Sequence, residues 1–137
     1  MTSPAKAACV FDAYGTLFNV HSAVGRHANS LGKAAAEISN LWRTKQLEYS
    51  WVHSLMRRHV DFWELTQRAL DYALTFHRVS DDQLKRALME SYLALDAYDE
   101  IRACYADFAR AVSRPLSYRT VLRTCCGTQW NLQVSAT

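Results

Sequence analysis

One short strand-type segment followed by a long helical stretch limits what this chain can fold into. Residues 8–11 are apolar, and the glycine and small polar side chains of residues 12–16 predict a loop. From Val20 onward, apolar residues recur at three- and four-residue steps for about 90 residues. A lone strand needs partners, and only residues 118–122 offer a second one. The chain up to about residue 110 is therefore expected to be a piece of an α/β protein.

Periodicity and capping signals predict the helices. Five are expected: Ser22 to Leu31, one starting near Ser39, residues 61–77, residues 81–95 and residues 98–111. Ser22 is expected to cap the first helix and Gly32 to end it. The acidic segment 80–82 suits the positive end of a helix dipole. Four antiparallel helices with short connections predict a helical bundle inserted behind the strand.

Composition narrows the classes of function. The chain has 137 residues, 50% of them hydrophobic, enough for one domain with a core. Charged residues make up 21% and the net charge is +3, so neither disorder nor nucleic-acid binding is indicated. No apolar stretch approaches the roughly 20 residues of a membrane helix. Residues 7–11 are too few for a signal peptide. We expect a soluble cytoplasmic protein without a nucleic-acid or membrane partner.

Cysteine and histidine spacing predicts neither a disulfide framework nor a metal site. The cysteines are Cys9, Cys104, Cys125 and Cys126, and the histidines stand at positions 21, 27, 53, 59 and 77. There is no CxxC, HxxxH or HExxH pattern. These side chains are expected to serve packing or the surface, with no metal and no cofactor.

The composition changes abruptly near the C-terminus. No acidic residue follows Asp107, whereas four arginines do: Arg110, Arg114, Arg119 and Arg123. A basic terminal arm is one explanation, and a shifted reading frame or a truncation is the other. Apolar residues throughout the tail favour the second, because a basic arm is usually rich in lysine and poor in apolar side chains. Sequencing the coding DNA across this region would distinguish them.

The segment from Val10 to Phe18, VFDAYGTLF, carries the clearest chemistry. Asp12 follows the first strand, and open α/β sheets bind ligands at the carboxyl ends of their strands. The loop can direct backbone N–H groups at an anion, and the Thr16 hydroxyl lies within reach of the Asp12 carboxylate. A solvated aspartate that only caps a turn is the alternative explanation.

This segment resembles the first signature of the haloacid dehalogenase superfamily, in which a strand-end aspartate is a covalent nucleophile. Most members resemble phosphatases, with bound Mg²⁺ and a second aspartate two positions on, where this chain has Tyr14. DAYGTLF is similar to the form in (S)-2-haloacid dehalogenases, which use no metal. The run LWRTKQLEYSW, residues 41–51, is similar to LWRxxQLEYxW of that branch. Residues 61–63 and 95–98 also resemble it, so the likeness covers about residues 7–107.

The resemblance implies an α/β fold class and a division of the chain. A partial haloacid-dehalogenase-like, Rossmannoid core would carry an inserted helical-bundle cap, with this chain mostly helical. Residues 1–19 would be the first strand and nucleophile loop, and residues 20–96 the cap. Residues 97–137 would return to the core with a truncated or aberrant tail. Such dehalogenases are often dimers, and Trp51 and Trp63 are candidates for exposed dimer contacts or for uncovered core.

The resemblance also implies a reaction. Short (S)-2-haloalkanoic acids would be hydrolysed to (R)-2-hydroxy acids through an ester on Asp12. Thr16 would orient Asp12, and the N–H groups of Ala13 and Tyr14 would bind the substrate carboxylate or the oxyanion. Water and the small haloacid would be the reactants.

Three side chains from the helical region would complete this site. Arg43 would stabilise the departing halide and the anionic substrate, and Leu47 and Phe62 would form an apolar wall with Tyr14. Without the resemblance, Arg43 reads as an ordinary exposed helix arginine. Phe62 is explained almost as well by core packing at helical spacing.

Three departures from the family and two alternative functions remain. The family has a Ser-Asn-Gly turn, a lysine and a late Ser/Asn/Asp cluster. In this chain the nearest candidate for the turn is Cys-Cys-Gly at 125–127. A cysteine thiol cannot mimic the asparagine amide of that turn, so slow or absent turnover of the substrate is expected. A non-enzymatic helical interaction module with an inert Asp12 is one alternative, opposed by the DAYGT loop together with Arg43. A phosphatase-type hydrolase of the same superfamily is the other, opposed by Tyr14.

Overall fold

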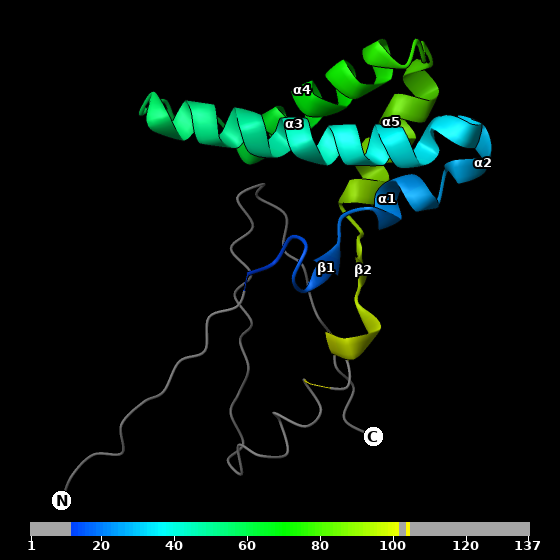
Figure 1. Ribbon diagram of the computed structural model, residues 1–137, viewed down its shortest axis with the longest axis horizontal. Coiled ribbons are helices and arrows are strands. Elements are labelled where there is room, and N and C mark those ends of the chain that lie inside the picture. Colours follow the sequence, from blue (N-terminus) through cyan, green and yellow to red (C-terminus); the bar gives the residue numbers. More distant parts are fainter. Residues whose placement is uncertain (1–11, 102–103, 105–137) are drawn as a thin grey trace, which may run out of the picture.

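A computed structural model describes residues 12–101 and 104, and this part is mostly helical. Its elements are β1 (Phe18–Asn19), α1 (Ser22–Gly25), α2 (Ala28–Leu31), the 3-10 helix η1 (Gly32–Ala34), α3 (Ala35–Leu55), α4 (Phe62–Phe76), α5 (Asp82–Tyr92) and β2 (Asp96–Ala97). Figure 1 shows α3 and α4 as a long antiparallel hairpin, with α1, α2 and α5 gathered at one end. The helices form one body above the two short strands.

Side-chain caps explain where α4 and α5 begin. The Asp61 carboxylate accepts a hydrogen bond from the Trp63 N–H at the start of α4. The Asp81 carboxylate accepts two, from the N–H groups of Gln83 and Leu84. Each cap satisfies donors that the first helical turn leaves unpaired. The predictions of helices over these two segments are confirmed.

The prediction of one continuous helix over residues 22–31 is wrong. Two short helices, α1 and α2, are separated at Arg26 and His27. Both residues make contacts with the far end of the helical region: Arg26 forms a 2.6 Å ion pair with Asp96, and His27 Nε2 lies 2.9 Å from Ser91 Oγ. These tertiary contacts outweigh the local helical pattern, which adds little stability over so few residues.

The long helix also differs from its predicted bounds. α3 begins at Ala35 rather than near Ser39. Alanines at its start favour helix strongly but provide no side-chain cap, so the sequence carries no start signal there. Gly32 ends α2 as predicted, and its φ of +57° is a backbone conformation that suits glycine. The chain then continues through η1 into α3 without a long loop.

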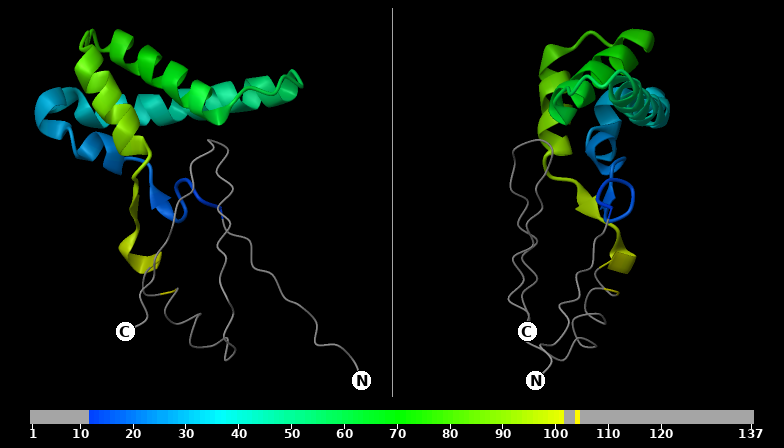
Figure 2. Two further views of the ribbon diagram at one scale, coloured as in Figure 1. Left: turned by 180° about the vertical axis from the view of Figure 1, so that it is seen from behind. Right: turned by 90° about the vertical axis from the view of Figure 1, so that its left-hand side faces the viewer.

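The two ends of the helical region lie side by side in an antiparallel pair, β1 with β2. Phe18 pairs with Ala97, and Asn19 pairs with Asp96. Ser22 does not cap a helix, because its hydroxyl donates to the Asn19 carbonyl at 2.7 Å and accepts from the Asp96 N–H at 3.1 Å. Figures 1 and 2 show the strands together beneath the helices. The sequence did not predict β2, whose two residues are too few for a strand pattern.

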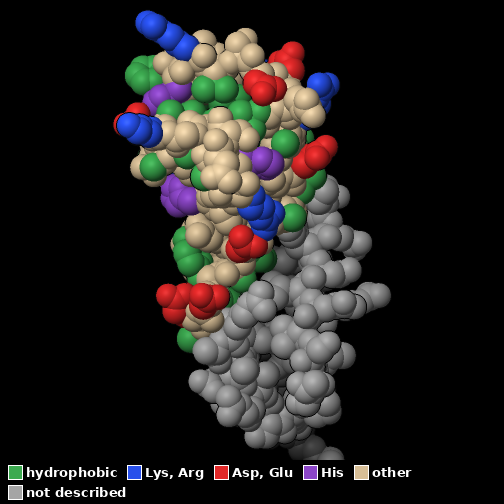
Figure 3. All heavy atoms as spheres, turned by 90° about the vertical axis from the view of Figure 1, so that its right-hand side faces the viewer, with side chains coloured by type: hydrophobic (Ala, Val, Ile, Leu, Met, Phe, Trp, Pro, Cys, Tyr) green, Lys and Arg blue, Asp and Glu red, His purple; other side chains and the backbone are tan. Residues whose placement is uncertain are grey.

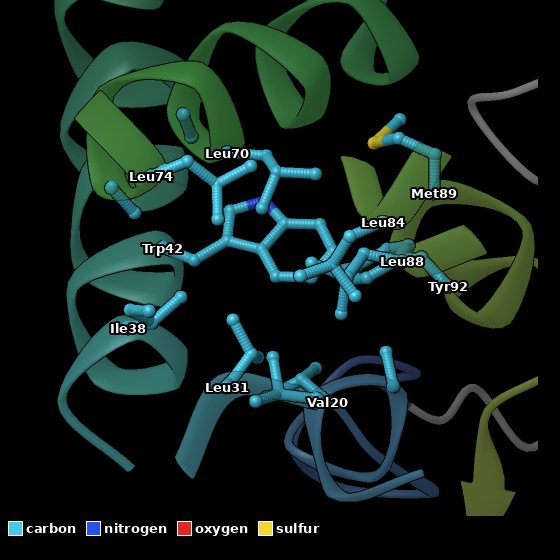
Figure 4. Close-up of a cluster of buried hydrophobic side chains, with 14 of the residues drawn as sticks. Val20, Leu31, Ile38, Trp42, Leu70, Leu74, Leu84, Leu88, Met89 and Tyr92 are labelled. Atoms are coloured by element: carbon cyan, nitrogen blue, oxygen red, sulfur yellow. The ribbon is translucent and has the colours of Figure 1, made fainter. Parts of the chain in front are cut away.

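The hydrophobic core lies where α1, α3, α4 and α5 meet. Trp42 of α3, 3% exposed, occupies its middle (Figure 4). Its ring centroid lies 5.2 Å from that of Tyr92, and its Nε1–H donates to the Thr66 carbonyl at 2.9 Å. Around it, other side chains are fully or almost fully buried: Val24, Ile38, Leu70, Leu74, Leu84 and Leu88. This packing fixes α3, α4 and α5 relative to one another.

The apolar period of α3 predicts the helix but not its buried extent. Large apolar side chains in its last turns are exposed: Trp51, Val52, Leu55 and Met56. The expectation of an exposed Trp63 is wrong, because that side chain is half-buried and packs against the core.

The homodimer stays a prediction. On the face drawn in Figure 3, acidic and basic side chains are interspersed rather than gathered by sign.

Several predictions fall on residues outside the described part of the chain. They concern the strand over 8–11, the strand over 118–122, the tail after Asp107, the Cys-Cys-Gly segment at 125–127 and most of the helix over 98–111. Residues 99–101 of that last segment are helical. Among the described helices, none combines the length and the apolar character needed to cross a membrane.

Candidate active site

The loop from residue 12 to residue 18 holds Asp12 and Thr16 face to face. The Thr16 hydroxyl donates to Asp12 Oδ2 at 2.8 Å. The Ala13 carbonyl closes the loop by accepting from the N–H groups of Leu17 at 3.0 Å and Phe18 at 2.9 Å. Both side chains of the Asp12–Thr16 pair are exposed. The result is a carboxylate oriented by a hydroxyl and open to a small molecule.

Arg43 reaches this loop from α3. Its Nη2 donates to the Tyr14 carbonyl at 3.0 Å, across 29 residues of sequence. Gly15 lies under the guanidinium: a Cβ built there would be 3.8 Å from Arg43 Nη2. The φ of Gly15 is +91°, a conformation that side chains other than glycine rarely adopt. The structure therefore brings the predicted acid, its threonine and the predicted arginine to one loop.

Two aromatic rings from the helices pack against Tyr14 of the loop. The Tyr14 ring lies 5.3 Å from that of Phe62 and 5.9 Å from that of Tyr92, the second pair stacked. Leu47 lies one turn along α3 from Arg43 and is half-buried. Tyr14 and Phe62 were predicted to be neighbours and are in contact. Tyr92, at the end of α5, was predicted only as part of a helix and is a third member of this aromatic group.

A buried amide behind Arg43 was missed by the sequence reasoning. Arg43 Nη1 donates to Gln46 Oε1 at 2.8 Å, and Gln46 is 1% exposed. Gln46 Nε2 donates to Thr66 Oγ1 at 2.6 Å and lies 2.9 Å from the Tyr92 hydroxyl. Gln46 stands inside the LWRTKQLEYSW run, but its partners come from α4 and α5. Helical spacing alone does not reveal such partners.

The two cations in this part of α3 have different surroundings. Lys45 donates to Glu48 at 2.7 Å, and this hydrogen bond raises the pKa of Lys45. Its Nζ also lies 4.7 Å from the centroid of the Tyr72 ring. Arg43, in contrast, donates to an amide and to a backbone carbonyl, both neutral.

Within the described residues, no group of three or more His, Cys, Asp or Glu side chains could hold a metal ion.

Comparison with known proteins identifies the relatives of this chain. No protein-family model matches it. An (S)-2-haloacid dehalogenase from Pseudomonas sp. (strain CBS-3) is 52% identical over 94 residues, which is 68% of this chain. A second, from Burkholderia cepacia, is 53% identical over 94 residues. The chain is a homologue of the (S)-2-haloacid dehalogenases. It spans 41% of the length of each of these two relatives.

Solved structures extend the likeness of this dehalogenase homologue to three dimensions. One dehalogenase crystal structure aligns with a TM-score of 0.73 and 45% identity, covering 80% of this chain and 49% of that one. The L-2-haloacid dehalogenase from Xanthobacter autotrophicus, with chloropropionic acid covalently bound, aligns with a TM-score of 0.62 and 37% identity. That match covers 71% of this chain and 40% of the other. The structural neighbours are haloacid dehalogenases, and the mostly helical described part is consistent with a partial core of that fold.

Proposed function

We propose that this chain carries the nucleophile half of a hydrolase that converts short (S)-2-haloalkanoic acids to (R)-2-hydroxy acids. Asp12 is the nucleophile in this proposal, and Thr16 orients it. Arg43 binds the halide and the substrate carboxylate. The N–H groups of Ala13 and Tyr14 face the anionic substrate or the oxyanion. The relatives support the reaction class, since two of them are (S)-2-haloacid dehalogenases and a structural neighbour carries covalent chloropropionic acid.

One observation carries the proposal: Arg43 is anchored to the loop that contains Asp12. Support comes from the 3.0 Å bond that Arg43 donates to the Tyr14 carbonyl, because it joins a cation to the loop whose Asp12 carboxylate accepts from Thr16. A nucleophilic carboxylate and a cation for the leaving halide are the two parts that displacement of a halide needs. An interaction module with an inert Asp12 requires neither part.

The proposed chemistry proceeds in two balanced steps. An oxygen of the Asp12 carboxylate forms a bond to C2 of the substrate while the carbon–halogen bond breaks, and the halide leaves with the bonding electron pair. Attack from the side opposite the halogen inverts C2. Water then hydrolyses the ester, which releases the 2-hydroxy acid and restores Asp12. Because a halide is a competent leaving group, the first step needs no proton donor where Tyr14 stands.

The helical region is proposed to act as a cap. Residues 20–96 would be inserted between core segments 1–19 and 97–137. The pairing of β1 with β2 supports this division, since the helical region starts and ends at the same place. The cap would supply Arg43, Leu47 and Phe62 to one side of the site. The aromatic contact between Tyr14 and Phe62 at 5.3 Å would then close an apolar wall that limits substrate size.

The proposal predicts chloride release from (S)-2-chloropropionate but not from the R form. Chloride would be measured with the purified 137-residue chain, both as a first-turnover burst and at steady state. The burst is needed because slow hydrolysis of the ester would otherwise hide the displacement step. Backside attack within one fixed site gives the selectivity, which is expected to be on the order of a hundredfold or more. Equal release from both enantiomers, or none from a folded chain, would contradict the proposal.

A measurement with a metal chelator distinguishes the proposed dehalogenase from the phosphatase-type alternative. Chloride release is expected to be unchanged when EDTA removes divalent cations. Hydrolysis of a phosphate monoester that depends on added Mg²⁺ would instead support the phosphatase-type function. A phosphatase-type member would carry an aspartate where this chain has Tyr14, whose ring is stacked on Tyr92 and lies beside Phe62.

A further inference from the structure

Gln46 is an amide enclosed by three helices. Its side chain is fully buried, and its hydrogen-bond partners lie on α3, α4 and α5. A buried amide is costly unless its donors and acceptor are bonded. All are used here: Nε2 bonds to Thr66 at 2.6 Å and lies 2.9 Å from the Tyr92 hydroxyl, and Oε1 accepts from Arg43 at 2.8 Å. The Tyr92 hydroxyl also lies 3.1 Å from Oε1.

The network determines which end of the amide faces Arg43. The Thr66 hydroxyl donates its hydrogen to the Phe62 carbonyl at 2.8 Å, so toward Gln46 it can only accept. The amide nitrogen must therefore face Thr66, and the amide oxygen must face Arg43. The guanidinium is held at two points, by this oxygen through Nη1 and by the Tyr14 carbonyl through Nη2. Its fork is thus fixed between the helical bundle and the nucleophile loop.

Both holding groups are neutral. A carboxylate in place of the amide would hold the guanidinium as firmly but would cancel much of its charge. Lys45, two residues away, shows the other arrangement, since its ammonium is paired with Glu48 at 2.7 Å. Because neither holding group carries a negative charge, neither reduces the positive charge of Arg43 toward an anion that enters beside Asp12.

We propose that Gln46 is a positioning residue that holds Arg43 against the nucleophile loop without neutralising its charge. This inference rests on the proposed function, because the charge in question is the one that would bind the halide and the substrate carboxylate. Thr66 and Tyr92 act one step further back by orienting the amide. The two parts of the proposal, orientation and neutrality, respond differently to two substitutions.

Gln46→Met removes the acceptor at similar volume, and Gln46→Glu keeps an acceptor but adds a negative charge. Two readouts on the full 137-residue chain separate their effects: side-chain nitrogen NMR of Arg43, and bromide affinity measured by tryptophan fluorescence. Gln46→Met is expected to free rotation of the guanidinium and weaken bromide binding several-fold. Gln46→Glu is expected to leave Arg43 ordered yet weaken bromide binding about tenfold or more. Gln67→Met and Gln67→Glu, on the exposed face of α4, are the matched controls and should change neither readout.

A merely structural role predicts a different result. Both Gln46 variants would then lower the unfolding midpoint, while the folded fraction would keep wild-type Arg43 signals and bromide affinity. That result would overturn the proposal. Unchanged Arg43 signals in Gln46→Met would overturn it by themselves, whatever the Gln46→Glu variant shows. The proposed function fails separately, if the wild type neither binds bromide nor releases chloride. The NMR result would still support orientation of Arg43 by Gln46 in that case.

Discussion

Replacement of Asp12 by asparagine is expected to abolish chloride release from (S)-2-chloropropionate. The amide has nearly the same shape and can still accept the hydrogen bond that Thr16 donates at 2.8 Å. It has no anionic oxygen to attack C2, so no ester can form. Loss of a covalent nucleophile usually costs about 10⁴-fold or more in rate. The first-turnover burst of chloride, measured beside a thermal unfolding curve, checks the prediction.

Asp81→Asn provides the matched control. Asp81 also accepts hydrogen bonds through a carboxylate, but it caps α5 away from the loop, and asparagine caps helices about as well. This variant should keep both the wild-type burst and the wild-type unfolding curve. A burst that survives in Asp12→Asn, or that is lost equally in both variants, would rule out Asp12 as the nucleophile.

Replacement of Trp42 by alanine is expected to cost about 3–5 kcal/mol of the free energy of unfolding. Trp42 is 3% exposed, contacts the Tyr92 ring and donates to the Thr66 carbonyl, so its removal leaves a cavity between α3, α4 and α5. Domains of this size are stable by only about 5–15 kcal/mol, so much of the fold's stability would be lost. Urea unfolding followed by circular dichroism would measure the change.

A second tryptophan on the same helix makes a control within the chain. Trp51 is 63% exposed, and Trp51→Ala should change the free energy of unfolding by no more than about 0.5 kcal/mol. Trp42→Phe keeps an aromatic ring in the core and remains measurable if the alanine variant does not fold. Equal losses from Trp42→Ala and Trp51→Ala would show that the core does not centre on Trp42.

Interactions between residues close in the sequence were predicted correctly. The starts of α4 and α5 were predictable because Asp61 and Asp81 bond to N–H groups only two or three residues away. The bond between Thr16 and Asp12 spans four residues and was expected for the same reason. Interactions of this kind depend on near neighbours alone, so the pattern of residues determines them.

Long-range contacts account for what the sequence did not predict. At the break between α1 and α2, Arg26 forms an ion pair with Asp96, 70 residues away. Gln46 resembles an ordinary polar helix residue, and its burial depends on Thr66 and Tyr92, which lie 20 and 46 residues further along. Helical period and propensity contain no information about such partners. Burial of polar side chains is therefore the feature that required the structure.

The covalent role of Asp12 can be tested most directly by mapping this residue after reaction. The 137-residue chain would react with (S)-2-chloropropionate in water labelled with the heavy oxygen isotope, followed by acid quenching, digestion and mass spectrometry. Attack by Asp12 predicts that its peptide carries the substrate-derived ester or, after hydrolysis, heavy oxygen in the Asp12 carboxylate. Chloride release with an unmodified and unlabelled Asp12 peptide would contradict the account, because water would then have displaced the halide directly.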